Sequence, residues 1–380
     1  RVFEFARGLG KGSTQRYRLV FDSPSVPAAS VQFAFKENNK ADPGTVRGPS
    51  CAGPIEGGIA RIYLRDLETG TTQLVSAGER TTCSDPSTPT NDPSENPDVT
   101  SGGDLVFFDT VSALAQDDLD DTSDLYVYDP ETCSLEILSG GVPGEATNPT
   151  SSDDGSVVAF EAGSPSEIVV LDRTTGVLTN LGPGTTPDLS ADGTRLAYVL
   201  DMGGVFQVFL ADLVAGTTEA VSLLDDGSFL PEGAASPSVA NGGLTAFEAP
   251  PSDPDAEILV RDVEQGSTSV ASSVGLGVDL CLSSPCGSFD PSISDDGRFV
   301  AFVVRGLLPV DEIIIKDLVT GDLTPLTRMA GADGDSLEPA LGDSGDFVVL
   351  SSFASQLGDA VGLAAPNVFF EGPTDPAASG

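Results

Sequence analysis

Short apolar runs recur along the chain, each preceded by a similar arrangement of proline, serine, aspartate and glycine. Residues 291–304 read PSISDDGRFVAFVV, and residues 187–200 read PDLSADGTRLAYVL. An Asp-Gly pair between two short runs is typical of a tight β-hairpin, because glycine adopts positive φ without steric cost. The apolar runs are rich in β-branched and aromatic residues and therefore predict strands. Further copies begin at residues 96, 148, 236 and 338.

A second phrase follows these hairpins after a variable gap. Residues 167–181 read EIVVLDRTTGVLTNL, and residues 312–327 read EIIIKDLVTGDLTPLT. An apolar strand ends in aspartate, and in five of six copies a glycine follows four residues later, which predicts another hairpin. We interpret these aspartates as turn-capping residues rather than catalytic carboxylates. They are Asp66, Asp129, Asp172, Asp212, Asp262 and Asp317.

Two hairpins make a four-stranded antiparallel unit, and no helical pattern interrupts the series. Repeated units of about 40 to 50 residues bury their faces only against their neighbours and pack radially. We therefore expect an all-β fold, a β-propeller of four-stranded antiparallel blades in a single domain. We count seven blades, with six or eight as alternatives. Their approximate bounds are 8–76, 96–139, 148–181, 186–222, 236–272, 290–327 and 338–370.

The two ends of the chain are expected to close the ring. We assign the inner strands of the first blade to RYRLVF at 16–21 and VQFAF at 31–35. The last blade has NVFF at 367–370 as its third strand and lacks a fourth. We expect residues 1–7, RVFEFAR, to supply that strand within one chain or between chains. Head-to-tail donation between chains would produce a filament.

The two phrases resemble the repeat of the TolB-like propeller family, whose PD repeat is related to the WD-repeat blade. The family pattern is a Pro-x-hydrophobic-Ser-x-Asp-Gly strand pair, then a hydrophobic strand ending in Asp, then Thr-Gly. PSISDDGRFVAF and IIIKDLVTG match this pattern, and the resemblance covers most of residues 57–352. It implies a propeller that serves as a binding platform or as an accessory to another domain.

The connections of such blades fall on two faces of the disc. Both hairpin turns of a meandering blade lie on one face, which we name the short-turn face. The connection between the two hairpins and the link to the next blade lie on the opposite face, which we name the long-loop face. Because function on rigid scaffolds concentrates on loops, we predict that the long-loop face binds a protein or surface partner. Its long connections are 37–60, 77–96, 110–123, 223–235, 273–290 and 353–366.

Charge limits the partners that this chain can bind. It has 58 acidic and 18 basic residues, a net charge of −40. Nucleic acid is excluded as an expected partner, because phosphate contacts require clustered lysine and arginine. No apolar run approaches the roughly 18 residues that a membrane-spanning helix needs. We interpret the acidic residues as solvated surface loops that attract cations, with adaptation to high salt as the alternative.

Histidine and tryptophan are absent from the chain. The absence of histidine removes the commonest general base and excludes Ser-His-Asp and Cys-His sites within this chain. No carboxylate pair stands out as a general acid and base. We therefore expect that the chain is not an enzyme. The alternative is a calcium-dependent carbohydrate-active enzyme that uses carboxylates on the long-loop face.

The loop QDDLDDTSD at 116–124 is the best metal candidate. Asp118, Asp120 and Asp124 alternate along it, and calcium binds several carboxylate oxygens on a short loop. The EF-hand spacing, with its glycine and distal glutamate, is missing. A calcium site and a solvated turn remain the two interpretations, and we expect no other cofactor.

Five cysteines in an acidic chain suggest disulfides. Cys281 and Cys286 lie in one loop and are predicted to pair. Cys51 and Cys83 lie in two long loops of the same face and form the second predicted pair. Cys133 occupies the turn position that is glycine in five sister blades, and we expect it to be exposed and unpaired.

The first residue is arginine, and no signal peptide is recognisable. We expect a removed leader and a secreted, extracellular or periplasmic location. The predicted function is a non-enzymatic binding or assembly scaffold, with polymerisation by exchange of residues 1–7 as one mode. A sensor or adaptor propeller is the alternative within the same class.

Overall fold

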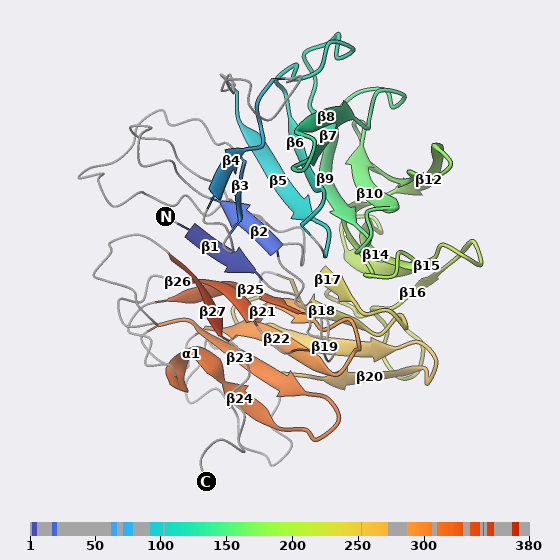
Figure 1. Cartoon of the computed structure of the whole chain (residues 1–380). Helices are drawn as coiled ribbons and strands as arrows, with labels where there is room; N and C mark the ends of the chain where they lie inside the picture. Colours follow the sequence, from blue (N-terminus) through green and yellow to red (C-terminus); the bar gives the residue numbers. More distant parts are fainter. Residues whose placement is uncertain are drawn as a thin grey trace.

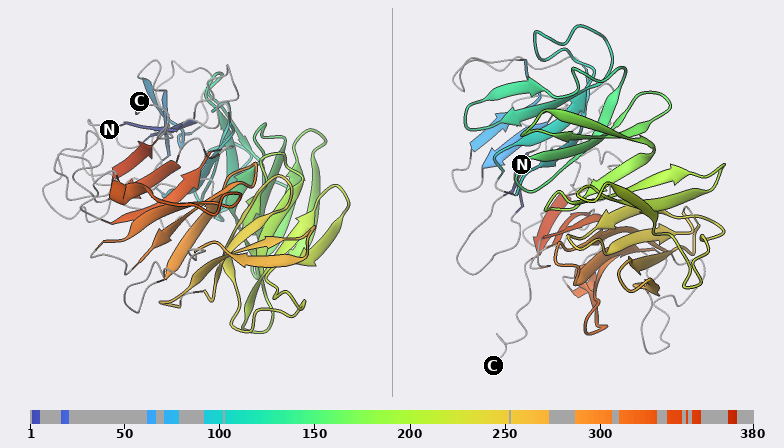
Figure 2. Two further views of the ribbon diagram at one scale, coloured as in Figure 1. Left: turned by 90° about the horizontal axis from the view of Figure 1, so that it is seen from below. Right: turned by 90° about the vertical axis from the view of Figure 1, so that its right-hand side faces the viewer.

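The computed structural model describes residues 2–5, 17–20, 62–66, 71–78, 92–352 and 367–371, with internal gaps at 102, 252, 273–286, 306–309, 330–334, 343–344 and 346–347. The described strands form seven antiparallel sheets, six with four strands and one with three. Figure 1 shows the sheets following one another around a central axis, and Figure 2 shows them from below and from the side. The predicted all-β propeller is thus confirmed. None of the described residues forms a helix long and apolar enough to cross a membrane.

The first four sheets follow the chain order and are named blades 1 to 4. Blade 1 contains β1 (Val2–Phe5), β2 (Tyr17–Val20), β3 (Tyr63–Asp66) and β4 (Thr71–Leu74). Blade 2 contains β5 (Ser94–Val99), β6 (Val106–Thr110), β7 (Asp124–Asp129) and β8 (Ser134–Ile137). Blade 3 contains β9 (Ala146–Ser151), β10 (Val157–Ala162), β11 (Glu167–Asp172) and β12 (Val177–Pro183). Blade 4 contains β13 (Thr185–Leu189), β14 (Arg195–Asp201), β15 (Phe206–Asp212) and β16 (Thr217–Ala220).

The remaining three sheets complete the described ring as blades 5 to 7. Blade 5 contains β17 (Ala235–Val239), β18 (Thr245–Ala249), β19 (Glu257–Asp262) and β20 (Ser267–Val270). Blade 6 contains β21 (Ser288–Ile293), β22 (Phe299–Val304), β23 (Glu312–Asp317) and β24 (Leu323–Pro325), followed by the single turn α1 (Leu326–Met329). Blade 7 contains β25 (Ser336–Leu341), β26 (Val348–Ser352) and β27 (Asn367–Glu371).

The N-terminal strand belongs to blade 1 and not to the last blade. β1 pairs with β2 in antiparallel register from Val2↔Val20 to Phe5↔Tyr17. The prediction that residues 1–7 pair with residues 367–370 is therefore wrong, and polymerisation by that strand loses its structural basis. A local hairpin closes a much shorter loop than pairing across the whole chain and costs less entropy. β1 still lies beside β27, so the first and last described strands are neighbours although they do not pair (Figure 1).

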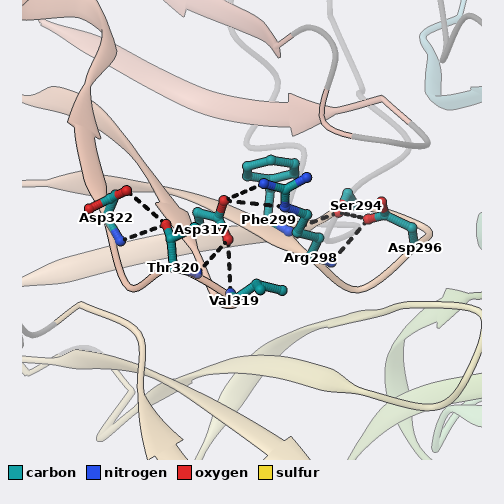
Figure 3. A network of polar contacts seen from close by, with 8 residues as sticks. All are labelled: Ser294, Asp296, Arg298, Phe299, Asp317, Val319, Thr320 and Asp322. Carbon is teal, nitrogen blue, oxygen red and sulfur yellow. Dashed lines mark hydrogen bonds and ion pairs between the residues drawn. The ribbon is translucent and has the colours of Figure 1, made fainter.

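Both hairpin turns of a blade lie together on the short-turn face, as blade 6 shows (Figure 3). In the first turn Asp296 Oδ1 accepts hydrogen bonds from Ser294 Oγ at 2.6 Å and from the Arg298 amide at 3.0 Å. In the second turn Asp317 Oδ1 accepts from the amides of residues 319 and 320 at 2.8 and 3.1 Å. An ion pair of 2.8 Å joins Arg298 to Asp317 and so connects the two turns.

The repeated aspartate at the end of the third strand has the same turn-capping role in other blades. Its Oδ1 accepts backbone amide hydrogen bonds from one or two following residues in Asp129, Asp172, Asp212 and Asp262. The interpretation of these aspartates as turn formers is confirmed for blades 2 to 6. In these blades the aspartates satisfy backbone amides of their own turns.

The inner strands of blades 2 to 6 each carry a β-bulge at the residue before a proline. These residues adopt positive φ between 46° and 53°, a region that bulky residues and residues before proline normally avoid. Bulges of this kind bend a strand and redirect a side chain. The residues are Asn96, Asn148, Thr186, Ser236 and Asp290, with φ values of 46°, 53°, 47°, 51° and 49°.

The residue after that proline connects one blade to the next. Its side-chain oxygen accepts a hydrogen bond from a backbone amide in the inner strand of the following blade, and the bond recurs at five successive joints. The acceptor and donor pairs are Asp98 with Ser151 (2.6 Å), Thr150 with Leu189 (3.2 Å), Asp188 with Val239 (2.7 Å), Ser238 with Ile293 (3.1 Å) and Ser292 with Leu341 (2.9 Å). In blade 7 the same position is Ala340, whose side chain has no acceptor.

A hydroxyl just after the fourth strand fixes the start of the third strand in the same blade. The hydroxyl oxygen accepts a backbone hydrogen bond of 2.9 to 3.1 Å in five blades. The hydroxyls belong to Ser76, Ser139, Ser222, Ser272 and Thr327, and all five residues are buried. Apolar cores fill the space between neighbouring blades, as where Phe107 of blade 2 packs with Val158 and Phe160 of blade 3.

The inter-blade hydrogen bond predicts the effect of a Ser292→Ala substitution. The change leaves the buried Leu341 amide without its acceptor, which costs about 1–3 kcal/mol of unfolding free energy. Ser267→Ala, at an exposed position in β20, serves as the control and should stay within about 0.5 kcal/mol of wild type. Urea unfolding followed by circular dichroism measures both. Equal effects of the two substitutions would contradict the role of Ser292.

Candidate metal site on the long-loop face

The candidate metal loop, residues 111–123, connects β6 to β7 and lies opposite the short turns of blade 2. Leu114 anchors it in the core with 4% exposure. The Leu114 amide also donates to the hydroxyl of Tyr126 at 3.2 Å. Ser112 Oγ donates to Asp92 at 3.0 Å on the incoming link from blade 1. The loop is therefore anchored by the buried side chain of Leu114 and by the hydrogen bond of Ser112.

This loop brings the three predicted metal ligands together. One carboxylate oxygen from each of Asp118, Asp120 and Asp124 lies within 4.8 Å of the other two. Asp118 and Asp124 are buried, with 8% and 7% exposure, and Asp120 is exposed. The alternating spacing in the sequence thus predicted their proximity. Carboxylate oxygens are the ligand type that calcium prefers, and three of them meet here.

Neighbouring side chains orient the three carboxylates. Tyr126 donates its hydroxyl proton to Asp118 Oδ2 at 2.5 Å, and Ser139 Oγ donates to Asp124 Oδ1. Thr122 donates to Asp120 Oδ1 from its amide at 2.9 Å and from its hydroxyl at 2.6 Å. Within the part of the chain that the structure describes, Oδ2 of Asp120 and Oδ2 of Asp124 accept no hydrogen bond. These two oxygens are available to a cation.

The electrostatics of the loop favour binding of a cation. Burial raises the pKa of Asp124, the hydrogen bond from Ser139 opposes that rise, and the charges of Asp118 and Asp120 add to it. The hydrogen bonds from Thr122 lower the pKa of Asp120. Burial, and then the hydrogen bond donated to Asp118, raise the pKa of Tyr126. A divalent cation would relieve the repulsion that disfavours ionised Asp124.

Cys133 corrects the predicted disulfide pattern. Its side chain is 1% exposed and disulfide-bonded, where we had expected an exposed free thiol. It keeps the positive φ of the turn, 56°, but lies in the same buried cluster as Ile62 and Val75 of the neighbouring blade. The sister blades have glycine at this turn position, which indicates the turn. Glycine has no side chain, so the comparison could not show which way the cysteine side chain points. The other four cysteines, Cys51, Cys83, Cys281 and Cys286, lie outside the described residues.

The two predicted disulfides, Cys51 with Cys83 and Cys281 with Cys286, fall on residues outside the described part of the chain and stay predictions.

Two acidic residues that the sequence analysis did not single out connect blades near the long-loop face. Asp109 Oδ1 accepts from Asn96 Nδ2 in its own blade at 2.8 Å and from the Asn148 amide of blade 3 at 3.2 Å. Glu161 repeats the arrangement one blade later with Asn148 Nδ2 at 2.8 Å and the Thr186 amide at 2.9 Å. The sequence contained a sign of both residues, because an acidic residue ends each of the apolar runs VFFD and VAFE.

The comparisons with known proteins support the fold. No protein-family model matches the chain, and no curated relative matches it. The chain is similar to a solved oligogalacturonate lyase in complex with manganese, at 11% identity over 84% of each chain and a TM-score of 0.52. It is also similar to the β-propeller domain of the trilobed protease from Pyrococcus furiosus, at 13% identity over 73% of this chain and 82% of that one, with a TM-score of 0.51.

TolB from Acinetobacter baumannii is a further structural neighbour. Identity is 19% over 78% of this chain, the TM-score is 0.45, and this chain spans 64% of the length of that protein. The neighbours of the chain are thus TolB and other β-propeller proteins. At these identities the likeness concerns the fold.

The comparisons also correct the expectation that the chain is not an enzyme. The propellers that match include a lyase and a domain of a protease. The fold alone therefore does not decide whether this chain is an enzyme. The argument from the absent histidine still excludes histidine-dependent sites within this chain and nothing further.

The buried Asp109 predicts a pH dependence of stability. Burial raises the pKa of its carboxyl from 3.8 to about 7, against opposing hydrogen bonds from Asn96 and Asn148. The folded state then holds the proton more tightly than the unfolded state, so stability falls as pH rises from about 4 to 7. Asp109→Asn keeps an acceptor oxygen and removes the ionisation.

The expected result is that Asp109→Asn gains stability over wild type as pH rises through this range, by at most about 4 kcal/mol. Urea unfolding at several pH values, compared between the two proteins, measures the difference. Parallel curves for variant and wild type would show that the Asp109 carboxyl does not titrate there.

Proposed function

We propose that the protein is a binding propeller that holds a calcium ion through Asp118, Asp120 and Asp124 and presents its long-loop face to a partner. The observation that carries the proposal is the meeting of these three carboxylates on one anchored loop of blade 2. The free oxygens of Asp120 and Asp124 support binding of a cation. The ion would fix the loop between β6 and β7 as part of the surface that a partner contacts.

We also propose that the protein works outside the cytoplasm, in the periplasm or at the cell exterior. The disulfide of Cys133 supports this location, because structural disulfides persist in oxidising compartments. The large excess of acidic residues keeps such a surface soluble and attracts cations to it.

Calcium is expected to raise the melting temperature of the wild-type protein. A ligand that prefers the native state stabilises it by mass action, by about 2.7 kcal/mol at a concentration 100 times its Kd. Asp124→Asn should abolish this calcium-dependent increment. Thermal unfolding in calcium and in excess chelator, at matched ionic strength, measures the increment for each protein.

The same variant should show the opposite effect in chelator. Because the pKa of Asp124 is raised, its ionisation opposes folding at neutral pH, and Asn removes that cost. Asp124→Asn is therefore expected to be more stable than wild type without calcium. Its melting temperature should rise less than that of wild type when calcium is added. Asp104→Asn, an exposed position in the first hairpin turn of blade 2, is the control. An increment that persists in Asp124→Asn would refute the calcium site.

A further inference from the structure

A groove opens on the long-loop face between blades 4 and 5, far along the ring from the blade 2 loop. Its volume is about 380 Å³, within the range of cavities that bind ligands. One wall is the link between the two blades, residues 224–233, and the other comes from β18, β19 and β20. Leu230, Ala249, Pro250 and Leu259 give it an apolar lining.

An exposed apolar edge continues this groove across blade 4. Met202, Val205 and Phe206 lie at the turn between β14 and β15 with exposed fractions of 50%, 36% and 47%. The turn touches the groove wall, since the Ala234 amide donates to the Phe206 carbonyl at 2.9 Å. Gly233 is required there, because a Cβ atom would lie 2.6 Å from that carbonyl oxygen. Large contiguous apolar surfaces on soluble proteins mark sites of interaction.

Carboxylates surround the apolar floor of the groove. Asp225, Glu232 and Glu257 line it, and none of its described lining residues is basic. The nearby Arg261 is buried behind the wall, where Nη1 donates to Thr268 Oγ1 at 3.1 Å. All three acids are exposed at the rim and remain accessible to a cationic group.

Charge also argues against the chain itself as the occupant. A second copy brings a net charge of −40 to an acidic rim. The C-terminal residues 372–380 contain one aspartate and neither lysine nor arginine. A complementary occupant carries positive charge beside aliphatic or aromatic side chains, and such complementarity steers binding and sets specificity.

We infer that the groove between blades 4 and 5 binds a basic, apolar peptide segment of a partner protein. Aliphatic side chains of that segment enter the groove against Leu230 and Leu259, and its lysine or arginine side chains meet Glu232 and Glu257 at the rim. The inference rests on the proposed binding function and names the partner class of the long-loop face.

The test uses the full chain and three defined hexapeptides in isothermal titration calorimetry at physiological salt. One peptide alternates leucine and lysine, one alternates leucine and glutamate, and one alternates serine and lysine. The leucine–lysine peptide is expected to bind, the leucine–glutamate peptide is not, and the serine–lysine peptide should bind more weakly because it lacks apolar side chains. Equal binding of both lysine peptides would reduce the interaction to charge and overturn the inference.

Variants then locate the binding site. Glu257→Gln should weaken the leucine–lysine peptide by about two- to fivefold, the effect of one exposed ion pair. Leu224→Ser, at a groove position that is 43% exposed, should weaken it through lost apolar contact. Glu136→Gln, an exposed glutamate in the outer strand of blade 2, is the matched control and should leave the Kd unchanged.

Three further results would overturn the inference. They are no binding of the leucine–lysine peptide, equal effects of Glu257→Gln and Glu136→Gln, and self-association of the chain that Leu224→Ser abolishes. The calcium increment of the melting temperature is measured on the same proteins and distinguishes the two proposals. If that increment persists while peptide binding fails, the groove inference fails and the calcium proposal stands.

Discussion

The hydrogen bonds along the uncovered edge of each inner strand are the constraint on which this ring depends. Each inner strand has one edge that no strand of its own blade covers, and its buried amides still need acceptors. Proline removes one donor from this edge, and the residue before it turns into a bulge at positive φ. The residue after it, such as Asp188 or Ser292, then accepts from the next blade. Blades 2 to 6 each complete the blade that follows in this way, whereas Ala340 in blade 7 has no side-chain acceptor to offer blade 1.

The two faces of the disc differ in how their polar groups find hydrogen-bond partners within the protein. On the short-turn face, aspartates such as Asp317 accept the amides of their own turns, and ion pairs join neighbouring turns. On the long-loop face, the links between strands vary in length and carry carboxylate oxygens without partners in the blade 2 loop, as well as the groove between blades 4 and 5. Both proposed binding sites therefore lie where the repeat is least regular.

Regular features of the sequence predicted the fold, and exceptions to the repeat account for the errors. Asp-Gly and Thr-Gly turns, the third-strand aspartates and the meeting of Asp118 with Asp124 depend on local spacing, which a sequence displays. The strand that pairs with β1, and whether Cys133 forms a disulfide, depend on competition between residues that lie far apart in the sequence. The local pattern does not decide that competition. Asp98, Thr150 and Ser238 are visible in the sequence as polar residues after the repeat proline of their blades, but their acceptor role needs the neighbouring blade in place. The groove has no sequence signature because its walls come from two blades.

Burial, more than the net charge of −40, decides what the carboxylates of this chain do. Salt screens exposed charges beyond about 8–10 Å, so the overall charge attracts cations without selecting among them. Where a carboxylate is buried, its charge is costly, and burial raises the pKa of both Asp109 and Asp124. Two amide groups, the side chain of Asn96 and the backbone of Asn148, offset that cost at Asp109, whereas Asp124 accepts one hydrogen bond, from Ser139. Glu232 and Glu257 are a third case, since they are exposed but stand beside an apolar floor. A partner that covers that floor excludes water from the rim, and only then does the sign of its charge discriminate strongly.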